Sequence, residues 1–131
     1  MSSPFPLDDQ GLPVGYRFRP DWELTPRQVQ SLRQGGDMGG GPVVLIDCRT
    51  EQEFAIAAIE GATFIPLHEA GQRLPELKAL ADRRIIVYCH HGMRSLQLTS
   101  FLRHQGCADV FSMAGGIDLW AMDIEPGMAR Y

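Results

Sequence analysis

Short apolar runs alternate with stretches of helical spacing from residue 25 onward. The runs at residues 43–46 and 84–89 are rich in β-branched residues and carry apolar side chains at consecutive positions, which is typical of strands buried on both faces. Shorter strands are expected at residues 63–65 and 110–113. Buried strands separated by helices predict an α/β domain with a central, mostly parallel sheet covered by helices on both faces. In such sheets, functional groups gather at the carboxyl ends of the strands.

The first helix has a clear start signal. Thr25 is an N-cap residue, Pro26 occupies the first helical position, and Gln28 completes a capping box. This helix is expected to end where the glycine-rich connector of residues 35–41 begins. Further helices are expected over residues 51–58, residues 68–80 with a break near Pro75, residues 95–104 and residues 116–122.

Residues 1–24 are predicted to form an arm that precedes the domain of residues 25–131. Prolines and glycines interrupt this segment, so no apolar periodicity survives in it. The arm nevertheless carries aromatic side chains, which are unusual in a solvated tail. We therefore expect it to lie in extended form against the domain or against a partner. Its aromatic residues are Phe5, Tyr16, Phe18 and Trp22.

Length, charge and cysteine content narrow the classes of function. A chain of 131 residues with 44% hydrophobic residues is sufficient for one ordinary domain. Its net charge of -4 argues against a nucleic-acid binder held by basic residues, and no apolar run is long enough to cross a bilayer. The first residues show no secretory signal, and 3 cysteines without a CxxC pair make no full disulfide framework. We therefore expect a reducing, cytoplasmic location and neither nucleic-acid nor membrane partners.

The segment that starts at Cys89 is the strongest candidate for chemistry. A thiol at the end of a buried strand is followed by a short loop and then by a helix, and such a junction aims consecutive backbone N–H groups at one point. A cysteine there is expected to titrate below its ordinary pKa of about 8.5 and to act as a nucleophilic thiolate. Gly92 allows backbone angles that other residues resist, and Ser95 is expected to cap the helix. The residues after Cys89 are His90, His91, Gly92, Met93, Arg94 and Ser95.

Two other interpretations of Cys89 stay open at this point. A cysteine that ends a strand is often a small buried hydrophobic residue. Zinc binding fits the sequence less well, because Cys89, His90 and His91 are adjacent and do not easily converge on one ion. We therefore expect no metal site.

The loop and its surroundings resemble the family of rhodanese-like domains. Residues 89–95 are similar to the active-site loop of that family. Residues 45–54 resemble its first strand and the acidic helix that follows, residues 60–67 its second strand, and residues 114–120 its closing glycine-rich turn and tryptophan. Each outer motif is weak alone, but their common order makes the resemblance specific over about residues 25–131. It implies a rhodanese-like three-layer domain.

The resemblance also implies a sulfurtransferase that needs no metal or organic cofactor. In the family, the loop cysteine takes a sulfane sulfur from a small anionic donor such as thiosulfate and holds it as a persulfide. It then passes this sulfur to a thiophilic acceptor. By this correspondence Cys89 is the nucleophile, Arg94 steadies the anionic donor, and the backbone N–H groups of residues 90–95 stabilise the persulfide, in agreement with the electrostatics of the loop.

The spacing between Cys89 and Arg94 separates two classes of enzyme. Related phosphatases have five residues between the cysteine and the arginine and form a larger cradle for phosphate, whereas four residues separate them here. The shorter loop resembles the sulfur-handling branch and disfavours phosphatase or arsenate reductase activity. One departure from the family is the pair Ala57 and Ala58, which stands where Gly-His is common. That departure concerns the packing of the loop rather than the chemistry.

Other residues at the predicted sheet edge have two interpretations each. Asp47 and Arg49 are candidates for accessory contacts to donor or acceptor, but a turn held by an Arg49 pair with Glu53 or another acid is favoured. Cys48 shares this edge with Cys89 and could resolve the persulfide into a disulfide, although a core position is favoured. The remaining candidates are expected to be structural or to lie on the surface: Cys107, His68, His104, Trp120, Gly115 and Gly116.

Two rival functions are retained beside thiosulfate sulfurtransferase activity. One is a non-catalytic interaction module with a protein partner, against which the intact Cys89 and Arg94 argue. The other is a sulfur relay whose acceptor is a protein, and the aromatic arm would favour it. Residues 126–131 also resemble the tails of rhodanese domains fused to activating enzymes for ubiquitin-like proteins, which is consistent with a relay.

Overall fold

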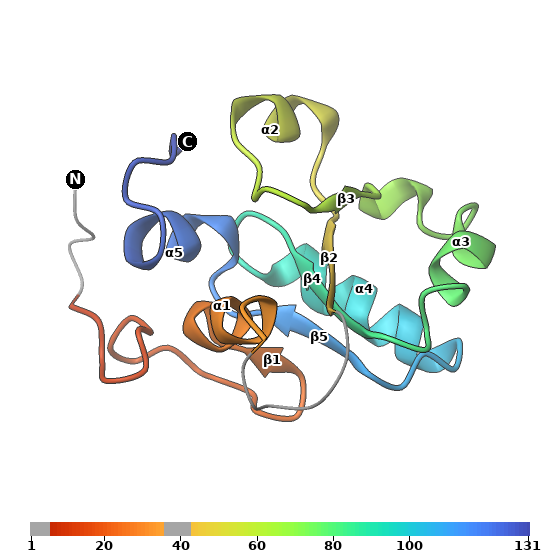
Figure 1. Ribbon diagram of the computed structural model, residues 1–131, viewed down its shortest axis with the longest axis horizontal. Coiled ribbons are helices and arrows are strands. Elements are labelled where there is room, and N and C mark those ends of the chain that lie inside the picture. The colour runs from red at the N-terminus through yellow and green to blue at the C-terminus, as the bar shows by residue number, and fades with distance from the viewer. Residues whose placement is uncertain (1–5, 36–42) are drawn as a thin grey trace.

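The computed structural model describes residues 6–35 and 43–131. The expectations for Phe5 and for most of the glycine-rich connector therefore lie outside the described residues. The described residues form the following elements in chain order (Figure 1): β1 (Glu23–Leu24), α1 (Pro26–Arg33), β2 (Val43–Asp47), α2 (Glu51–Ile56), β3 (Thr63–Phe64), the 3-10 helix η1 (Leu67–Glu69), α3 (Leu74–Lys78), β4 (Arg84–Tyr88), α4 (Met93–His104), β5 (Val110–Met113) and α5 (Gly116–Asp123).

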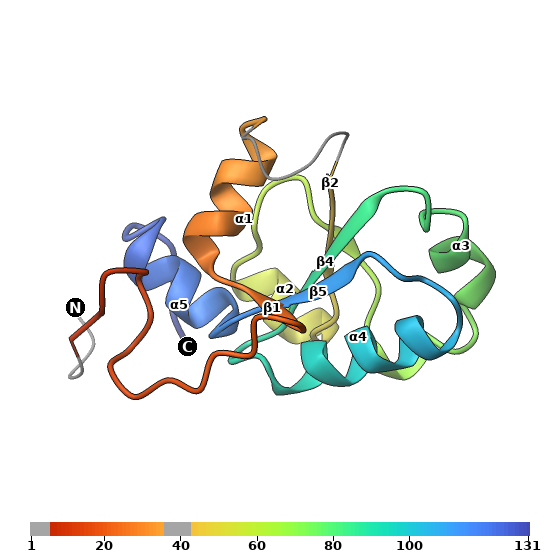
Figure 2. The same ribbon diagram turned by 90° about the horizontal axis from the view of Figure 1, so that it is seen from below.

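The strands of the described residues form one parallel sheet in the order β1-β5-β4-β2-β3. Helices α3 and α4 cover one face of this sheet, and α1 and α5 cover the other (Figure 2). The predicted α/β architecture with helices on both faces is confirmed. The carboxyl ends of β2 and β4 lie next to each other, because Asp47 pairs with Tyr88 in the register of these strands.

The central strand β4 explains why the sheet is buried on both sides. Ile85 and Val87 pack into the core under α3 and α4, whereas Ile86 and Tyr88 pack into the core under α1 and α5. All four side chains are fully buried, as the run of consecutive apolar residues predicted. The strands expected from the sequence are therefore confirmed, with small differences at their ends.

Capping boxes start the first two helices. At α1, the N–H of Gln28 donates to the Thr25 hydroxyl at 3.1 Å and the N–H of Thr25 donates to the Gln28 side chain at 2.8 Å. The same reciprocal arrangement joins Thr50 and Glu53 at α2. The start signal predicted for α1 is confirmed, and a glutamine and a glutamate perform the same capping task in this chain.

Two features of the fold differ from the expectations. Strand β1 was not predicted, because two residues are too few to show a period; Glu23 pairs with Ser112 on β5. The helix expected over residues 68–80 with a break near Pro75 is instead two separate elements, η1 and α3. Pro75 lies in the first turn of α3 rather than at a break, a position that suits its fixed φ and missing N–H.

The described part of the arm lies along the domain. Leu12 is buried in a small cluster with Ala114 and Leu119. The hydroxyl of Tyr16 donates to the buried Glu23 carboxylate at 2.6 Å and accepts from the N–H of Gly115 at 3.2 Å. The arm thus contacts the turn that follows β5. Within residues 6–35 and 43–131, no helix has the length and apolar character to span a membrane.

Candidate active site

Cys89 stands directly after β4 and begins the loop that leads into α4. The loop ends at Gly92, whose φ of 111° is a conformation that residues with a Cβ rarely adopt. The expectation that Ser95 caps the helix was wrong, because α4 already begins at Met93 and Gly92 is its N-cap residue. Ser95 lies in the first turn instead, and its hydroxyl donates to the Gly92 carbonyl at 3.1 Å.

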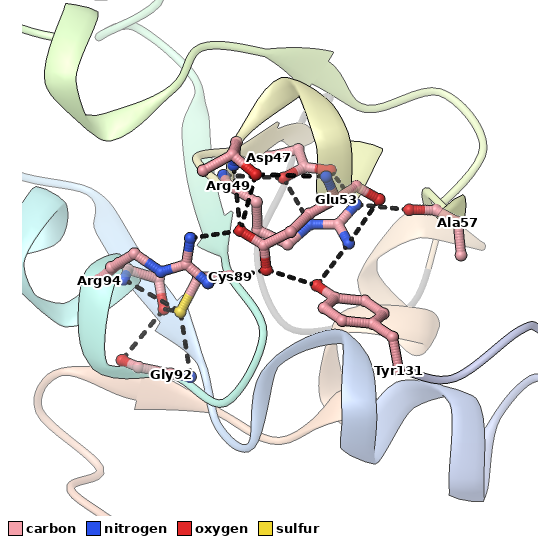
Figure 3. A network of polar contacts seen from close by, with 10 residues as sticks. Asp47, Arg49, Glu53, Ala57, Cys89, Gly92, Arg94 and Tyr131 are labelled. Atoms are coloured by element: carbon pink, nitrogen blue, oxygen red, sulfur yellow. Dashed lines mark hydrogen bonds and ion pairs between the residues drawn. The ribbon is translucent and has the colours of Figure 1, made fainter. Parts of the chain in front are cut away.

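Hydrogen-bond donors of the loop surround the Cys89 sulfur (Figure 3). The backbone N–H of Gly92 donates to it at 3.1 Å and that of Ser95 at 3.4 Å. The Ser95 hydroxyl lies 3.4 Å from the sulfur and 2.7 Å from the Ser112 hydroxyl on β5. Cys89 is only 1% exposed, so these donors act on the sulfur with little competition from water.

Cys48, which follows the neighbouring strand, also acts on the charge of Cys89. Both cysteines follow directly on residues paired between β2 and β4, and both belong to the core under α3 and α4. The Cys48 hydrogen bond, followed by contacts from Ser95 and Gly92, lowers the pKa of Cys89 to about 5 although burial opposes this. The same hydrogen bond and burial raise the pKa of Cys48. Cys48 therefore stays a thiol where Cys89 is a thiolate.

The N-terminus of α5 holds the other side of the loop. The N–H of Ile117 donates to the Cys89 carbonyl at 2.8 Å, and the N–H of Asp118 donates to the His90 carbonyl at 3.1 Å. A side chain on Gly116, which has a φ of +61°, would overlap the backbone of Cys89 and His90. The glycine pair at the start of α5 thus allows its backbone to lie close to the backbone of the active loop, as expected for a tight turn beside the site.

The remaining side chains near the loop lie around the site rather than at the sulfur. His90 is stacked between neighbours, with its ring centroid 3.9 Å from His91 and 4.0 Å from Tyr131. Burial, followed by the charge of His91, lowers the pKa of His90, which favours a neutral ring. Met93, the first residue of α4, is 74% exposed, and His91 lies 3.9 Å from the Asp118 carboxylate. Met93 thus presents an exposed apolar side chain at the start of α4.

Arg94 forms a paired contact with Glu53 of α2. Its two terminal nitrogens donate to the two carboxylate oxygens at 2.6 and 3.0 Å (Figure 3). The pair is partly buried, with 33% of the Arg94 side chain and 16% of the Glu53 side chain exposed. Hydrogen bonds from Arg94 hold the pKa of Glu53 well below its ordinary range. The Arg94 charge also acts on the thiols of Cys89 and Cys48.

Asp47 and Arg49 form a fully buried ion pair under this network. The guanidinium donates to the two Asp47 oxygens at 2.9 and 2.6 Å, and the Tyr88 hydroxyl donates to Asp47 at 2.7 Å. Arg49 also donates to the Ala57 carbonyl at 2.6 Å. The acid that pairs with Arg49 is thus Asp47 and not the Glu53 carboxylate. This arrangement ties α2 to the end of β2.

Sequence reasoning missed the roles of Glu53 and Tyr131. The Tyr131 hydroxyl accepts from Arg49 at 2.8 Å and donates to Glu53 at 2.7 Å, so it joins the two ion pairs. Glu53 was considered only as a possible partner of Arg49, and nothing local to it indicated Arg94 as its partner. Tyr131 had been singled out only as part of a tail.

A cavity of about 300 Å³ opens beside this network, on the side of Cys48. Its two arginines, Arg49 and Arg94, are each already paired with an acid. Leu67 and Cys48 contribute its apolar wall. The full lining is Cys48, Arg49, Thr50, Leu67, His68 and Arg94.

The other residues named from the sequence are core or exposed residues, and His68 among them lines the cavity beside Cys48. Cys107 is buried under α3 and α4, and Trp120 is a core residue between α1 and α5. His68 and His104 are exposed, as expected. Among residues 6–35 and 43–131, no group of three or more His, Cys, Asp or Glu side chains could hold a metal ion.

Comparisons with known proteins agree with this geometry. The model of the rhodanese-like domain matches residues 25–123. Thiosulfate sulfurtransferase GlpE of Haemophilus influenzae is 37% identical over 100 residues, which cover 75% of this chain and 86% of that protein. The probable adenylyltransferase/sulfurtransferase MoeZ of Mycobacterium tuberculosis is 33% identical over 110 residues, which cover 82% of this chain but 26% of MoeZ.

Solved structures show the same fold. The human single-domain sulfurtransferase TSTD1 matches with a TM-score of 0.59 and 26% identity, over 79% of this chain and 96% of that one. Reduced CoADR-RHD of Bacillus anthracis matches with a TM-score of 0.69 and 26% identity, over 84% of this chain and 18% of that one. The family match spans most of the chain and includes the Cys89 loop, and the chain therefore belongs to the family of rhodanese-like domains.

Proposed function

We propose that this protein is a sulfurtransferase that carries a sulfane sulfur on Cys89 as a persulfide. The observation that carries the proposal is the Cys89 sulfur, which lies 3.1 Å from the N–H of Gly92 and 3.4 Å from that of Ser95. These donors and the Cys48 thiol stabilise negative charge on sulfur, so they support both the attacking thiolate and the persulfide anion.

The reaction consists of two displacements at sulfur. The Cys89 thiolate attacks the outer sulfur of a donor such as thiosulfate, the S–S bond of the donor breaks, and sulfite leaves with the electron pair. A thiophilic acceptor, for example cyanide, then attacks the outer sulfur of the persulfide, and Cys89 leaves as a thiolate. Neither step needs a metal, an organic cofactor or an external oxidant. In this proposal Arg94 binds the oxygen atoms of an anionic donor.

The proposal is tested by intact-protein mass spectrometry after brief incubation with thiosulfate. We expect the wild-type protein to gain the mass of one sulfur atom and to lose it again with dithiothreitol. The variant Cys89→Ser should gain nothing, whereas Cys107→Ser, which removes a buried thiol outside the site, should gain sulfur like the wild type. A wild-type protein that takes no sulfur from thiosulfate or from a cysteine-desulfurase persulfide would refute the proposal.

A sulfur relay to a protein acceptor is the second candidate. Met93, exposed at the start of α4 directly after the active loop, supports it because an exposed apolar side chain there suits contact with another protein. The similarity to MoeZ, whose name combines adenylyltransferase and sulfurtransferase, points the same way. Sulfur uptake from a cysteine desulfurase that greatly exceeds uptake from thiosulfate would favour the relay. A non-catalytic interaction module would show no uptake from either source.

A further inference from the structure

Arg94, which lines the cavity beside the site, forms an ion pair with Glu53. Both terminal nitrogens of Arg94 donate to Glu53, at 2.6 and 3.0 Å. The same carboxylate accepts from the Tyr131 hydroxyl at 2.7 Å and from the N–H of Thr50 at 3.2 Å. These contacts keep Glu53 ionised at any pH at which the protein is used. An anionic donor that approaches Arg94 therefore meets a fixed negative charge at the same place.

The two arginines that line the cavity bring little unpaired positive charge to the site. Arg49 is offset by Asp47 and Arg94 is offset by Glu53, each within a hydrogen-bonded pair. The Cys89 thiolate adds one negative charge. His90 is held toward its neutral form by burial. A doubly charged donor is therefore repelled more strongly here than a donor with a single charge or none.

The cavity beside Cys48 also offers little unpaired positive charge to a donor. Its walls include Leu67 and the Cys48 thiol, and the charges of Arg49 and Arg94 at its edge are already paired. An organic group attached to the sulfane sulfur would find apolar contact there. Inorganic thiosulfate has no such group and gains nothing from these walls.

From this arrangement we infer that Glu53 is a specificity-determining residue, which disfavours dianionic inorganic donors and selects organic sulfane-sulfur donors of low charge, such as thiosulfonates and thiol persulfides. The inference rests on the proposed function, because it concerns the donor of the Cys89 persulfide. It assigns to Glu53 a role beyond capping α2. Thiosulfate remains a donor in this view, but a weakly bound one.

The variant Glu53→Gln removes the negative charge of Glu53 and keeps the shape of its side chain. Glutamine at this position of a capping box still accepts from the backbone N–H of Thr50, and Gln28 performs this task at α1 in the same chain. The substitution thus leaves the helix start intact and frees Arg94 from its counter-charge. Glu51→Gln is the matched control, because it removes an equal charge from an exposed position in the same helix turn.

The experiment compares two donors that differ by one charge. Sodium thiosulfate is a dianion, and sodium methanethiosulfonate is a monoanion that carries a methyl group in place of one oxygen. Each transfers its outer sulfur to the Cys89 thiolate, and sulfite or methanesulfinate leaves with the electron pair of the broken bond. The kcat and KM of cyanide-dependent turnover are measured for both donors with wild type, Glu53→Gln and Glu51→Gln.

We expect Glu53→Gln to lower the KM for thiosulfate about tenfold, because the partly exposed pair is moderately screened by water. The KM for methanethiosulfonate should change less than about threefold, since the monoanion meets half the repulsion. The kcat values and both constants of Glu51→Gln should stay near those of the wild type. Equal changes for the two donors, or a thiosulfate KM that does not fall, would overturn the inference.

The outcome separates this inference from the proposed function. If wild-type Cys89 gains sulfur in the mass spectrum and Glu53→Gln shows no donor preference, only the role of Glu53 fails. If wild-type Cys89 gains sulfur from neither donor, the sulfurtransferase proposal itself fails and the inference fails with it. A Glu53→Gln protein with an unchanged unfolding midpoint excludes loss of structure as the cause of any difference.

Discussion

Cys48 and Cys89 follow directly on Asp47 and Tyr88, which pair between two adjacent parallel strands, and the Cys48 thiol lowers the pKa of Cys89. Both thiols are 1% exposed, and burial by itself would raise the pKa of each. The interaction between the two thiols shifts their pKa values in opposite directions, because it favours a thiolate on Cys89 and a thiol on Cys48. The reactive state of the site thus depends on a residue outside the active loop.

Removal of the Cys48 donor should raise the pKa of Cys89. A hydrogen bond to a charged group contributes about 1.5–3 kcal/mol, which corresponds to about 1–2 pKa units. We expect Cys48→Ala to move the midpoint upward by this amount from the wild-type value of about 5. Only the thiolate reacts with iodoacetamide, so the alkylation rate of Cys89 rises with pH through its pKa. Peptide mass spectrometry across pH 4–9 measures the midpoint for Cys89 alone.

Cys48→Ser is the matched control for this prediction. Its hydroxyl keeps a donor at the same position, so the midpoint should stay closer to that of the wild type than the midpoint of Cys48→Ala does. At pH near 5, the alanine variant should also take up sulfur more slowly than the serine variant. A midpoint unaffected by Cys48→Ala would mean that the loop N–H groups alone determine the pKa.

Gly116 controls the position of the active loop from outside it. A Cβ at this position would overlap the backbone of Cys89 and His90, and its φ of +61° already disfavours other residues. Gly116→Ala should therefore displace the loop, lower the free energy of unfolding by about 2 kcal/mol or more, and suppress sulfur uptake. Urea unfolding and mass spectrometry measure the two effects.

Gly71→Ala is the corresponding control. Open space surrounds the position of its Cβ, and its φ lies outside the positive range. This variant should unfold within about 0.5 kcal/mol of the wild type and take up sulfur normally. Comparable losses in both variants would show that the Gly116 contact does not hold the loop.

The sheet and the nucleophile could be predicted because their signals are local. The consecutive apolar residues of β4 indicated a strand buried on both faces, and Cys89 followed it directly within a strand–loop–helix junction. Strand β1 escaped prediction because Glu23 and Leu24 belong to the sheet only through pairing with β5. Pro75 was read as a helix breaker, although proline also suits the first turn of a helix.

The contacts that complete the site are long-range and left no local signal. Arg94 and Glu53 lie 41 positions apart, and Tyr131 and Arg49 lie 82 positions apart. Each of these side chains has several candidate partners in the sequence, and only the folded sheet selects among them. For this reason the sequence predicted an Arg49 pair with Glu53 or another acid without selecting between them, and the folded structure shows that the acid is Asp47.

The Asp47–Arg49 pair is expected to matter for stability rather than for the chemical step. Both side chains are fully buried, so Asp47→Asn leaves a guanidinium without its counter-charge in the interior. Breaking such a pair costs about 3–5 kcal/mol. We expect urea unfolding to show a loss of this size for Asp47→Asn. The exposed pair of Arg73 and Glu76 is the contrast, and Glu76→Gln should cost less than about 1 kcal/mol. Similar small losses in both variants would contradict the prediction.

Leu12 tests whether the arm is an integral part of the fold. Its side chain is buried against Ala114 and Leu119, so Leu12→Ala removes apolar contact and leaves a cavity. Such substitutions cost about 2–5 kcal/mol. Val14, two positions away, is 62% exposed, and Val14→Ala should change stability by less than about 0.5 kcal/mol. Urea unfolding of both variants measures the difference. Equal, small losses would mean that the arm detaches readily in solution, and its aromatic residues would then be available to a protein partner.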